Sequence, residues 1–275
     1  MLKKLRENPL LSSLLVLLLY AGLFILPAFF VQSDPEQHGI SGVDGAISQW
    51  PTQLVFGVIF ILIVSLLGWW GKIGFRGINQ GGLKFLLPPF LLALSLLIFS
   101  NMNAHTDHWF LGFDRMKQLF GMVLVMLALG FTEETMFRGV LFHGLETRFT
   151  PLITVMGSAV IFGLFHFVNL LVDAGFYDTA YQVLHAAAAG FMYASLRLRL
   201  GAIWPVMLFH GFWDFSLFTS QTMSGVVAGA DTTSSFSLLR ALLIMLPAFI
   251  YGLYVYWRWS VWYRSQPETG LASGN

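Results

Sequence analysis

Hydrophobic positions along the chain form long runs that are separated by short polar connections. Runs of about 18 or more apolar residues are typical of membrane spans, and these runs lack the alternation that marks a strand. Backbone groups inside lipid must be hydrogen-bonded within their own span, which favours helices. The sequence therefore predicts an all-α, polytopic transmembrane helical bundle. Its eight expected spans run approximately over Pro9–Val31, Thr52–Trp70, Phe85–Ser100, Leu119–Phe142, Pro151–Leu171, Ala180–Leu196, Ala202–Phe218 and Leu238–Trp257.

Composition agrees with a membrane protein and narrows the possible chemistry. Of the 275 residues, 56% are hydrophobic and 11% are charged, whereas a soluble domain carries about 25% charged residues. Cysteine is absent, which excludes disulfides, thiolate metal sites and a cysteine nucleophile. The net charge is +1 and no basic block is present, so we expect no nucleic-acid partner.

The first apolar run follows a positive start formed by Lys3, Lys4 and Arg6, as in a secretory signal. It is longer than the roughly 7–15 apolar residues of a signal peptide, and no clear small-residue cleavage site ends it. We therefore expect an uncleaved first span.

Basic residues gather in alternate connections, as the positive-inside rule requires. The N-terminus, the second loop and the tail are basic, whereas the first loop is acidic and holds no Lys or Arg. This pattern predicts an integral membrane protein with both termini in the cytoplasm, and the short loops favour a bacterial plasma membrane. Arg115, Lys117 and Arg240 do not fit the alternation, and we expect their long side chains to reach the interface.

The fourth expected span contains charged residues, although a charge in mid-span costs about 2.5–3.5 kcal/mol on insertion scales. Glu134 and Arg138 are four residues apart and can pair along one helix face. That pairing leaves Glu133 without a charged partner on its own helix, as suits a general base. The alternative is a buried salt-bridge cluster that locks helices together, but a second adjacent glutamate adds cost without an obvious partner.

Two further spans carry ionisable residues. The fifth holds His166, with Asn169 one turn later as a possible partner of His166, and the seventh holds His210 and Asp214, four residues apart on one face. Ionisable residues inside a membrane face the bundle interior and tend to meet there. A carboxylate base and imidazoles could activate a water and stabilise the oxyanion formed on a carbonyl, which is a hydrolase constellation.

The same side chains could instead hold a divalent metal through histidine and glutamate. The helical His-Glu-x-x-His pattern of zinc proteases is absent, however. No serine in a nucleophile-elbow context is present either. Cofactor content therefore stays open between a divalent metal such as zinc and none.

Three ordered motifs resemble those of the CPBP intramembrane proteases, a family that includes CAAX prenyl endopeptidases and bacteriocin-immunity relatives. They are Glu133-Glu134-x-x-x-Arg138, Phe162-x-x-x-His166 and His210-x-x-x-Asp214. The resemblance covers roughly residues 119–218. It therefore divides the chain into N-terminal spans (1–118), a CPBP-like catalytic core (119–218) and a last span with its tail (219–275).

The resemblance implies an intramembrane endopeptidase that acts on a protein or peptide within the lipid bilayer, and it assigns a role to each motif position. Glu133 is implied as the general base, and His166 as a residue that holds the water. His210 and Asp214 are implied to lie beside the oxyanion. An ionised Asp214 donates no hydrogen bond, so we expect it to orient His210 rather than to contact the oxyanion. Glu134 and Arg138 are implied to orient the site. The family is called a metalloprotease group, in which case Glu133, His166 and His210 would be the ligands, but a glutamate-activated water without metal is also proposed for it.

Two other functions use the same residues. A non-catalytic immunity or scaffold protein would use them as a helix-locking network. A proton-coupled transporter would use buried Glu and His as a relay, but the sequence shows no internal repeat and no pair of broken spans.

Overall fold

The computed structural model describes residues 2–30, 47, 49–103, 113–172, 175–224 and 235–266, and these residues contain helices and no strand. In chain order the elements are α1 (Leu2–Glu7), α2 (Pro9–Phe30), α4 (Trp50–Leu67), the 3-10 helix η2 (Gln80–Leu86), α5 (Leu87–Asn103), α6 (Phe113–Glu134), the π-helix η3 (Thr135–Leu141), α7 (Phe142–Glu146), α8 (Pro151–Phe165), the 3-10 helix η4 (His166–Val172), α9 (Phe176–Leu200), α10 (Trp204–Ser224) and α11 (Ser235–Arg264).

Each expected span overlaps one helix or one continuous helical stretch, and the predicted all-α bundle is confirmed; residues 68–70 of the second span lie beyond the end of α4, and Val31 of the first lies outside the described residues. Among the described residues, four stretches are long and apolar enough to cross a membrane: Trp50–Leu67, Gln80–Phe99, Met116–Glu146 and Pro151–Leu171. Crossing by the other four helices stays a prediction, and so does the side on which the termini lie. The side chains of Arg115 and Arg240 fall outside the described part of the chain, and Lys117 is exposed.

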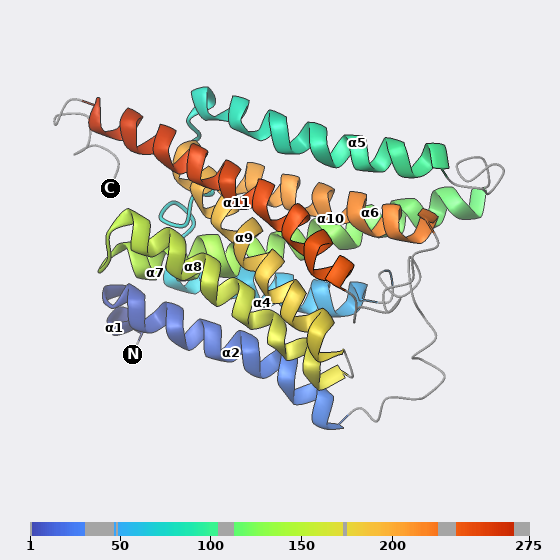
Figure 1. Ribbon diagram of the computed structural model, residues 1–275. Helices are drawn as coiled ribbons and strands as arrows, with labels where there is room; N and C mark the ends of the chain where they lie inside the picture. The colour runs from blue at the N-terminus through green and yellow to red at the C-terminus, as the bar shows by residue number, and fades with distance from the viewer. Residues whose placement is uncertain are drawn as a thin grey trace.

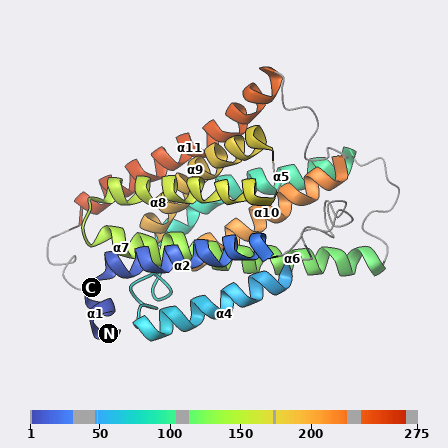
Figure 2. The ribbon, with the colours of Figure 1, turned by 90° about the horizontal axis from the view of Figure 1, so that it is seen from below.

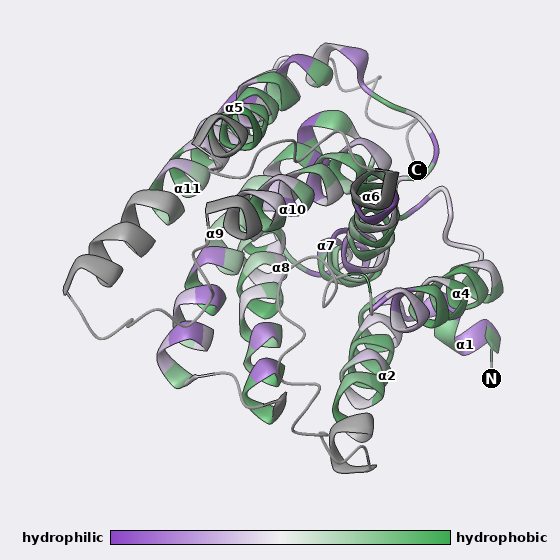
Figure 3. Ribbon diagram, turned by 90° about the vertical axis from the view of Figure 1, so that its right-hand side faces the viewer, coloured by the Kyte–Doolittle hydropathy of each residue, from purple (hydrophilic) through white to green (hydrophobic). Residues whose placement is uncertain are grey.

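Helix α4 has one face buried in the bundle and an opposite face that is exposed and apolar. Its buried positions recur every three or four residues, from Gln53 through Phe56 and Phe60 to Val64 and Leu67, as expected for one face of a helix. The outward face of α4 is also apolar (Leu54, Val55, Val58, Ile61, Leu62). A helix that is hydrophobic all round suits a lipid environment, and Figure 3 shows hydrophobic residues on the outer sides of α2, α4 and α5.

The helices pack side by side, with the start of α1 and the end of α11 at the same end of the bundle (Figures 1 and 2). Helix α9 packs against both α8 and α11, and α10 packs against both α6 and α5. Helices α2 and α4 cover the stretch formed by α6 and η3. The segment from α6 to α10 is therefore enclosed on several sides by helices from both ends of the chain.

Glycines allow α6 and α10 to approach closely. A Cβ added to Gly130 of α6 would lie 2.6 Å from the Met207 carbonyl oxygen, and one added to Gly211 of α10 would lie 2.7 Å from the Met126 carbonyl oxygen. Apolar burial gives little drive for helix association in lipid, so close packing through small residues takes its place. Because Gly211 follows His210, this contact also sets the distance between His210 and the glutamates of α6.

Candidate active site

The α-helical hydrogen-bond pattern of α6 ends at Glu134, and the seven residues Thr135–Leu141 form a π-helix that leads into α7. All seven are buried. Ser158 of α8 donates a hydrogen bond of 2.9 Å to the Phe137 carbonyl within this segment. Single π-helical turns are frequent at functional sites, and this one follows directly after the two glutamates.

Glu134 and Arg138 form the ion pair that their spacing predicts. Arg138 Nη1 lies 3.0 Å from Glu134 Oε1, and both side chains are fully buried. The guanidinium carbon lies 4.1 Å from the ring centroid of Phe162 and 5.3 Å from that of Tyr193. Aromatic faces on α8 and α9 therefore enclose the cation. Gly190 leaves room for it, because a Cβ there would lie 2.9 Å from Arg138 Nη2.

His210 connects the two glutamates with Asp214. Its Nδ1 lies 2.9 Å from Glu134 Oε1, the oxygen that also accepts from Arg138. This short contact with a carboxylate makes Nδ1 a donor and fixes the ring orientation. Nε2 then faces the other two carboxylates, at 3.7 Å from Glu133 Oε2 and 3.4 Å from Asp214 Oδ2. The Tyr193 ring lies against the imidazole, with 4.7 Å between the centroids.

His166 lies at the junction of α8 and η4. Its Nδ1 is 2.9 Å from the Phe162 carbonyl oxygen, and its ring packs edge-on against the Phe162 ring at 5.0 Å. When Nδ1 donates to that carbonyl, Nε2 is left as an acceptor. Asn169 donates to Gln182 Oε1 of α9 at 2.8 Å. The hydrogen bond found for Asn169 is therefore with Gln182 rather than with His166.

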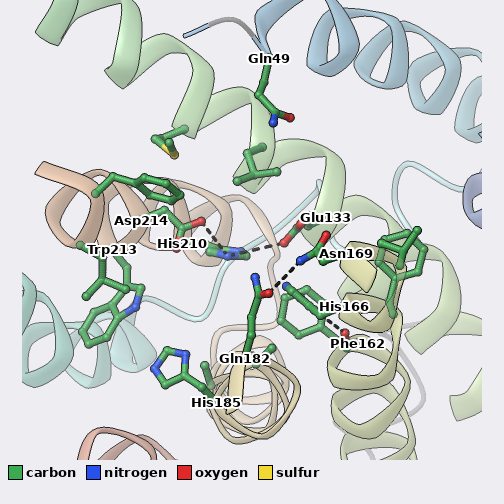
Figure 4. A pocket seen from close by; sticks show the side chains of 18 of the residues that line it. Gln49, Glu133, Phe162, His166, Asn169, Gln182, His185, His210, Trp213 and Asp214 are labelled. Atoms are coloured by element: carbon green, nitrogen blue, oxygen red, sulfur yellow. Dashed lines mark hydrogen bonds and ion pairs between the residues drawn. The ribbon is translucent and has the colours of Figure 1, made fainter. Parts of the chain in front are cut away.

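A cavity of about 760 Å³ joins these side chains. Figure 4 shows Glu133, His166, His210 and Asp214 around one space, with the Asn169–Gln182 pair beside them. Glu134 and Arg138 do not line this cavity. The structure thus brings all six expected site residues into one region, with four at the cavity and two buried behind it.

Helix α9 contributes more to the cavity than its sequence indicates. The Ala186–Gly190 segment predicts close helix packing, and that packing is present at Gly190. Gln182, His185 and Tyr193 of the same helix also line the cavity. Their positions relative to Ala186 and Ala189 follow the spacing of a single helix face, and this periodicity is the signal that could have identified them.

Within the described part of the chain, no group of three or more His, Asp or Glu side chains is arranged to hold a metal ion. The predicted ligand set of Glu133, His166 and His210 lines one cavity, and its role as a ligand set stays a prediction. His210 directs Nδ1 to Glu134 and Nε2 toward two carboxylates. In the neutral form of His210 this leaves a lone pair on Nε2, as in a zinc ligand whose other ring nitrogen donates to a carboxylate.

Comparison with known families identifies the segment that carries the three motifs. Residues 115–216 match the model of a family described as type II CAAX prenyl endopeptidase Rce1-like. The match confirms the resemblance to the CPBP and CAAX proteases over this segment, and it supports a CAAX-type membrane protease at family level. No curated protein and no solved structure matches the chain.

Proposed function

We propose that the chain is an intramembrane endopeptidase in which Glu133 activates a water to hydrolyse a peptide bond. The observation that carries this proposal is the different engagement of the two adjacent glutamates. Glu134 is fully buried and bound by Arg138 and His210. Glu133 lines the cavity, and His210 Nε2 lies 3.7 Å from its Oε2, which is beyond hydrogen-bond length. It is therefore the carboxylate that is free to accept a proton.

The reaction follows from the positions of these groups. Glu133 accepts a proton from a water in the cavity, and the resulting hydroxide forms a C–O bond with the substrate carbonyl carbon. His210, doubly protonated among the surrounding carboxylates, donates from Nε2 to the oxyanion that develops while Nδ1 stays bound to Glu134. Glu133 then returns its proton to the amide nitrogen as the C–N bond breaks. The products are a carboxylic acid and an amine, and no step passes through a metal.

The remaining residues orient this chemistry. His166 presents Nε2 to the cavity as an acceptor for the attacking water, while its Nδ1 is held by the Phe162 carbonyl. Asp214 lies beside His210 Nε2 and keeps the imidazole directed at the cavity. Glu134 and Arg138 form a rigid base for His210, because one Glu134 oxygen accepts from both residues.

The test compares peptide fragments from cells that express wild type, Glu133→Gln or Glu146→Gln at equal membrane abundance. Glu146 is the matched control because it lies on the same helical stretch and pairs with His143, away from the cavity. A general base contributes about 10²–10⁴ in rate. Fragments should therefore disappear with Glu133→Gln and persist with Glu146→Gln.

An unchanged fragment pattern from a folded Glu133→Gln protein would contradict the proposal. The buried cluster would then act as the helix-locking network of a non-catalytic membrane protein.

A further inference from the structure

The cavity opens toward one end of the helix bundle. Four of the side chains that line it are exposed, and we call them the cavity mouth: Gln49, Asp178, Gln182 and Phe218. Gln49 directly precedes α4, Asp178 and Gln182 lie in the first two turns of α9, and Phe218 lies in the second half of α10. In Figure 1 these parts of the three helices lie at the end of the bundle away from the start of α1 and the end of α11.

Exposure falls along these helices from the cavity mouth to the proposed catalytic residues. On α10, Phe218 is 39% exposed and His210 is 4% exposed. On α9, Gln182 is exposed, whereas Tyr193 is 1% exposed and lies against the His210 ring. The proposed catalytic residues therefore lie at the deep end of the cavity. Within the described part of the chain, the mouth is the route by which a substrate reaches them.

The cavity mouth is mostly polar, which suits water better than lipid, because burying polar groups in an apolar medium is costly. Next to it, Asn169 Nδ2 donates to Gln182 Oε1 at 2.8 Å, and both side chains line the cavity (Figure 4). The second polar atom of each amide takes no part in this bond, so the pair still offers an acceptor and a donor. The backbone of an extended peptide carries the complementary N–H and C=O groups.

Basic residues gather at the opposite end of the bundle. Arg6 of α1 donates to the carbonyl oxygen of Leu66, near the end of α4, at 2.6 and 3.0 Å. The Arg199 guanidinium carbon, near the end of α9, lies 5.2 Å from the Phe85 ring centroid of η2 and 4.9 Å from the Trp262 ring centroid of α11. These contacts bring the basic N-terminus, second loop and tail together at one end.

The charges predict which side of the membrane each end faces. At the mouth end, the basic residues of the described helices are Arg115, Lys117 and Arg240, at the starts of α6 and α11. Except for the buried Arg138, the other basic residues belong to segments at the opposite end. Cytoplasmic connections carry the excess of Lys and Arg in membrane proteins. We therefore expect the end that holds the termini in the cytoplasm, and the cavity mouth on the other side.

We propose that the cavity mouth opens on the non-cytoplasmic side of the membrane, opposite to both termini, and that the substrate is an extended polypeptide segment that enters from that side. The part of this inference that concerns the substrate rests on the proposed function. The side of the mouth does not, because it follows from exposure and charge alone. Segments of other proteins that stay in the cytoplasm would not reach Glu133.

The experiment uses single cysteines, because the wild-type chain contains none. Gln182→Cys places a thiol at the cavity mouth, and Ser265→Cys places the matched control just after α11, where Ser265 is exposed and does not line the cavity. The probe is a charged maleimide that does not cross membranes, and accessible thiols react with it. It is applied to intact cells and to permeabilised cells, with the cysteine-free wild type as background.

Gln182→Cys should be labelled in intact cells, whereas Ser265→Cys should be labelled only after permeabilisation. Labelling of intact cells should also stop the formation of the fragments that depend on Glu133 in the Gln182→Cys protein, because the bound maleimide fills the mouth. The same treatment should leave these fragments unchanged in wild type and in Ser265→Cys.

Three results would overturn the inference: no labelling of Gln182→Cys in intact cells, labelling of both cysteines in intact cells, or labelling of Gln182→Cys without loss of fragments. Each leaves the proposed function intact, provided that Glu133→Gln removes the fragments. Fragments that persist in a folded Glu133→Gln protein would instead remove the endopeptidase and its substrate, while the labelling would still locate the mouth.

Discussion

Substituting Gly211 with alanine tests whether the close approach of α6 and α10 holds the site together. An added Cβ would lie 2.7 Å from the Met126 carbonyl oxygen and 3.0 Å from the Leu127 Cα. Favourable contacts between heavy atoms lie near 3.5 Å, so the two backbones must separate by about 0.5 Å or more. Both obstructing atoms belong to the backbone of a packed helix, and they cannot move aside as a flexible side chain could.

The same displacement acts on the next residue. His210 Nδ1 lies 2.9 Å from Glu134 Oε1, and a shift of about 0.5 Å takes this contact beyond ordinary hydrogen-bond length. Overpacking costs about 1–3 kcal/mol, and a weakened hydrogen bond to a charged group adds up to about 1.5–3 kcal/mol. We therefore expect Gly211→Ala to destabilise the protein by about 2–5 kcal/mol and to reduce cleavage by the folded fraction.

The measurement is thermal unfolding in detergent together with cleavage of a quenched fluorescent peptide copied from the cleavage site that the fragment comparison identifies. Gly57→Ala in α4 is the control, because its Cβ would lie 3.9 Å from the Phe131 ring, an ordinary contact. Replacing a helical glycine with alanine gains about 0.5–1 kcal/mol where space allows. If Gly211→Ala unfolded and cleaved like Gly57→Ala, the reasoning about the α6–α10 contact would be wrong.

Three more outcomes follow from the site. Arg138→Met leaves the buried Glu134 without its cation and should destabilise the protein by about 3–5 kcal/mol in thermal unfolding; a wild-type melting temperature would contradict this. Asp214→Asn keeps an oxygen beside His210 Nε2, so kcat should stay within about tenfold of wild type, whereas Asp214→Leu removes the acceptor and should lose more. Because Glu133 alone is proposed to activate the water, chelation with phenanthroline should leave cleavage unchanged; a loss that zinc restores would place a metal in the reaction.

Single-helix periodicity predicts the parts of the site that lie on one helix. The i, i+4 spacing predicts the Glu134–Arg138 pair, and the pair is present. The same spacing places His210 and Asp214 on one face, where Asp214 Oδ2 lies 3.4 Å from His210 Nε2. The expected spans also overlap the observed helices, although α9 and α11 begin and end several residues outside their predicted ranges and α4 ends at Leu67, before its predicted end.

The periodicity of a single helix does not predict which residues of different helices contact each other. The hydrogen bond from His210 to Glu134 depends on how far Gly211 lets α10 approach α6. The pairing of Asn169 with Gln182 depends on the approach of η4 to α9. The roles of the site residues themselves stay predictions until the substitutions are made.

The π-helix after Glu134 has a consequence for how this segment tolerates changes in length. A π-helical turn closes its hydrogen bonds one residue further along than an α-helical turn, so it contains an extra residue relative to a regular α-helix. A deletion of one residue in Thr135–Leu141 could therefore be absorbed by conversion to α-helix, with α6 and α7 keeping their orientation. A deletion at residues 135–137 would also alter the spacing between Glu134 and Arg138, whereas one at residues 139–141 would leave that spacing unchanged. A deletion before Arg138 would thus leave a chain that still forms the bundle but no longer forms the site.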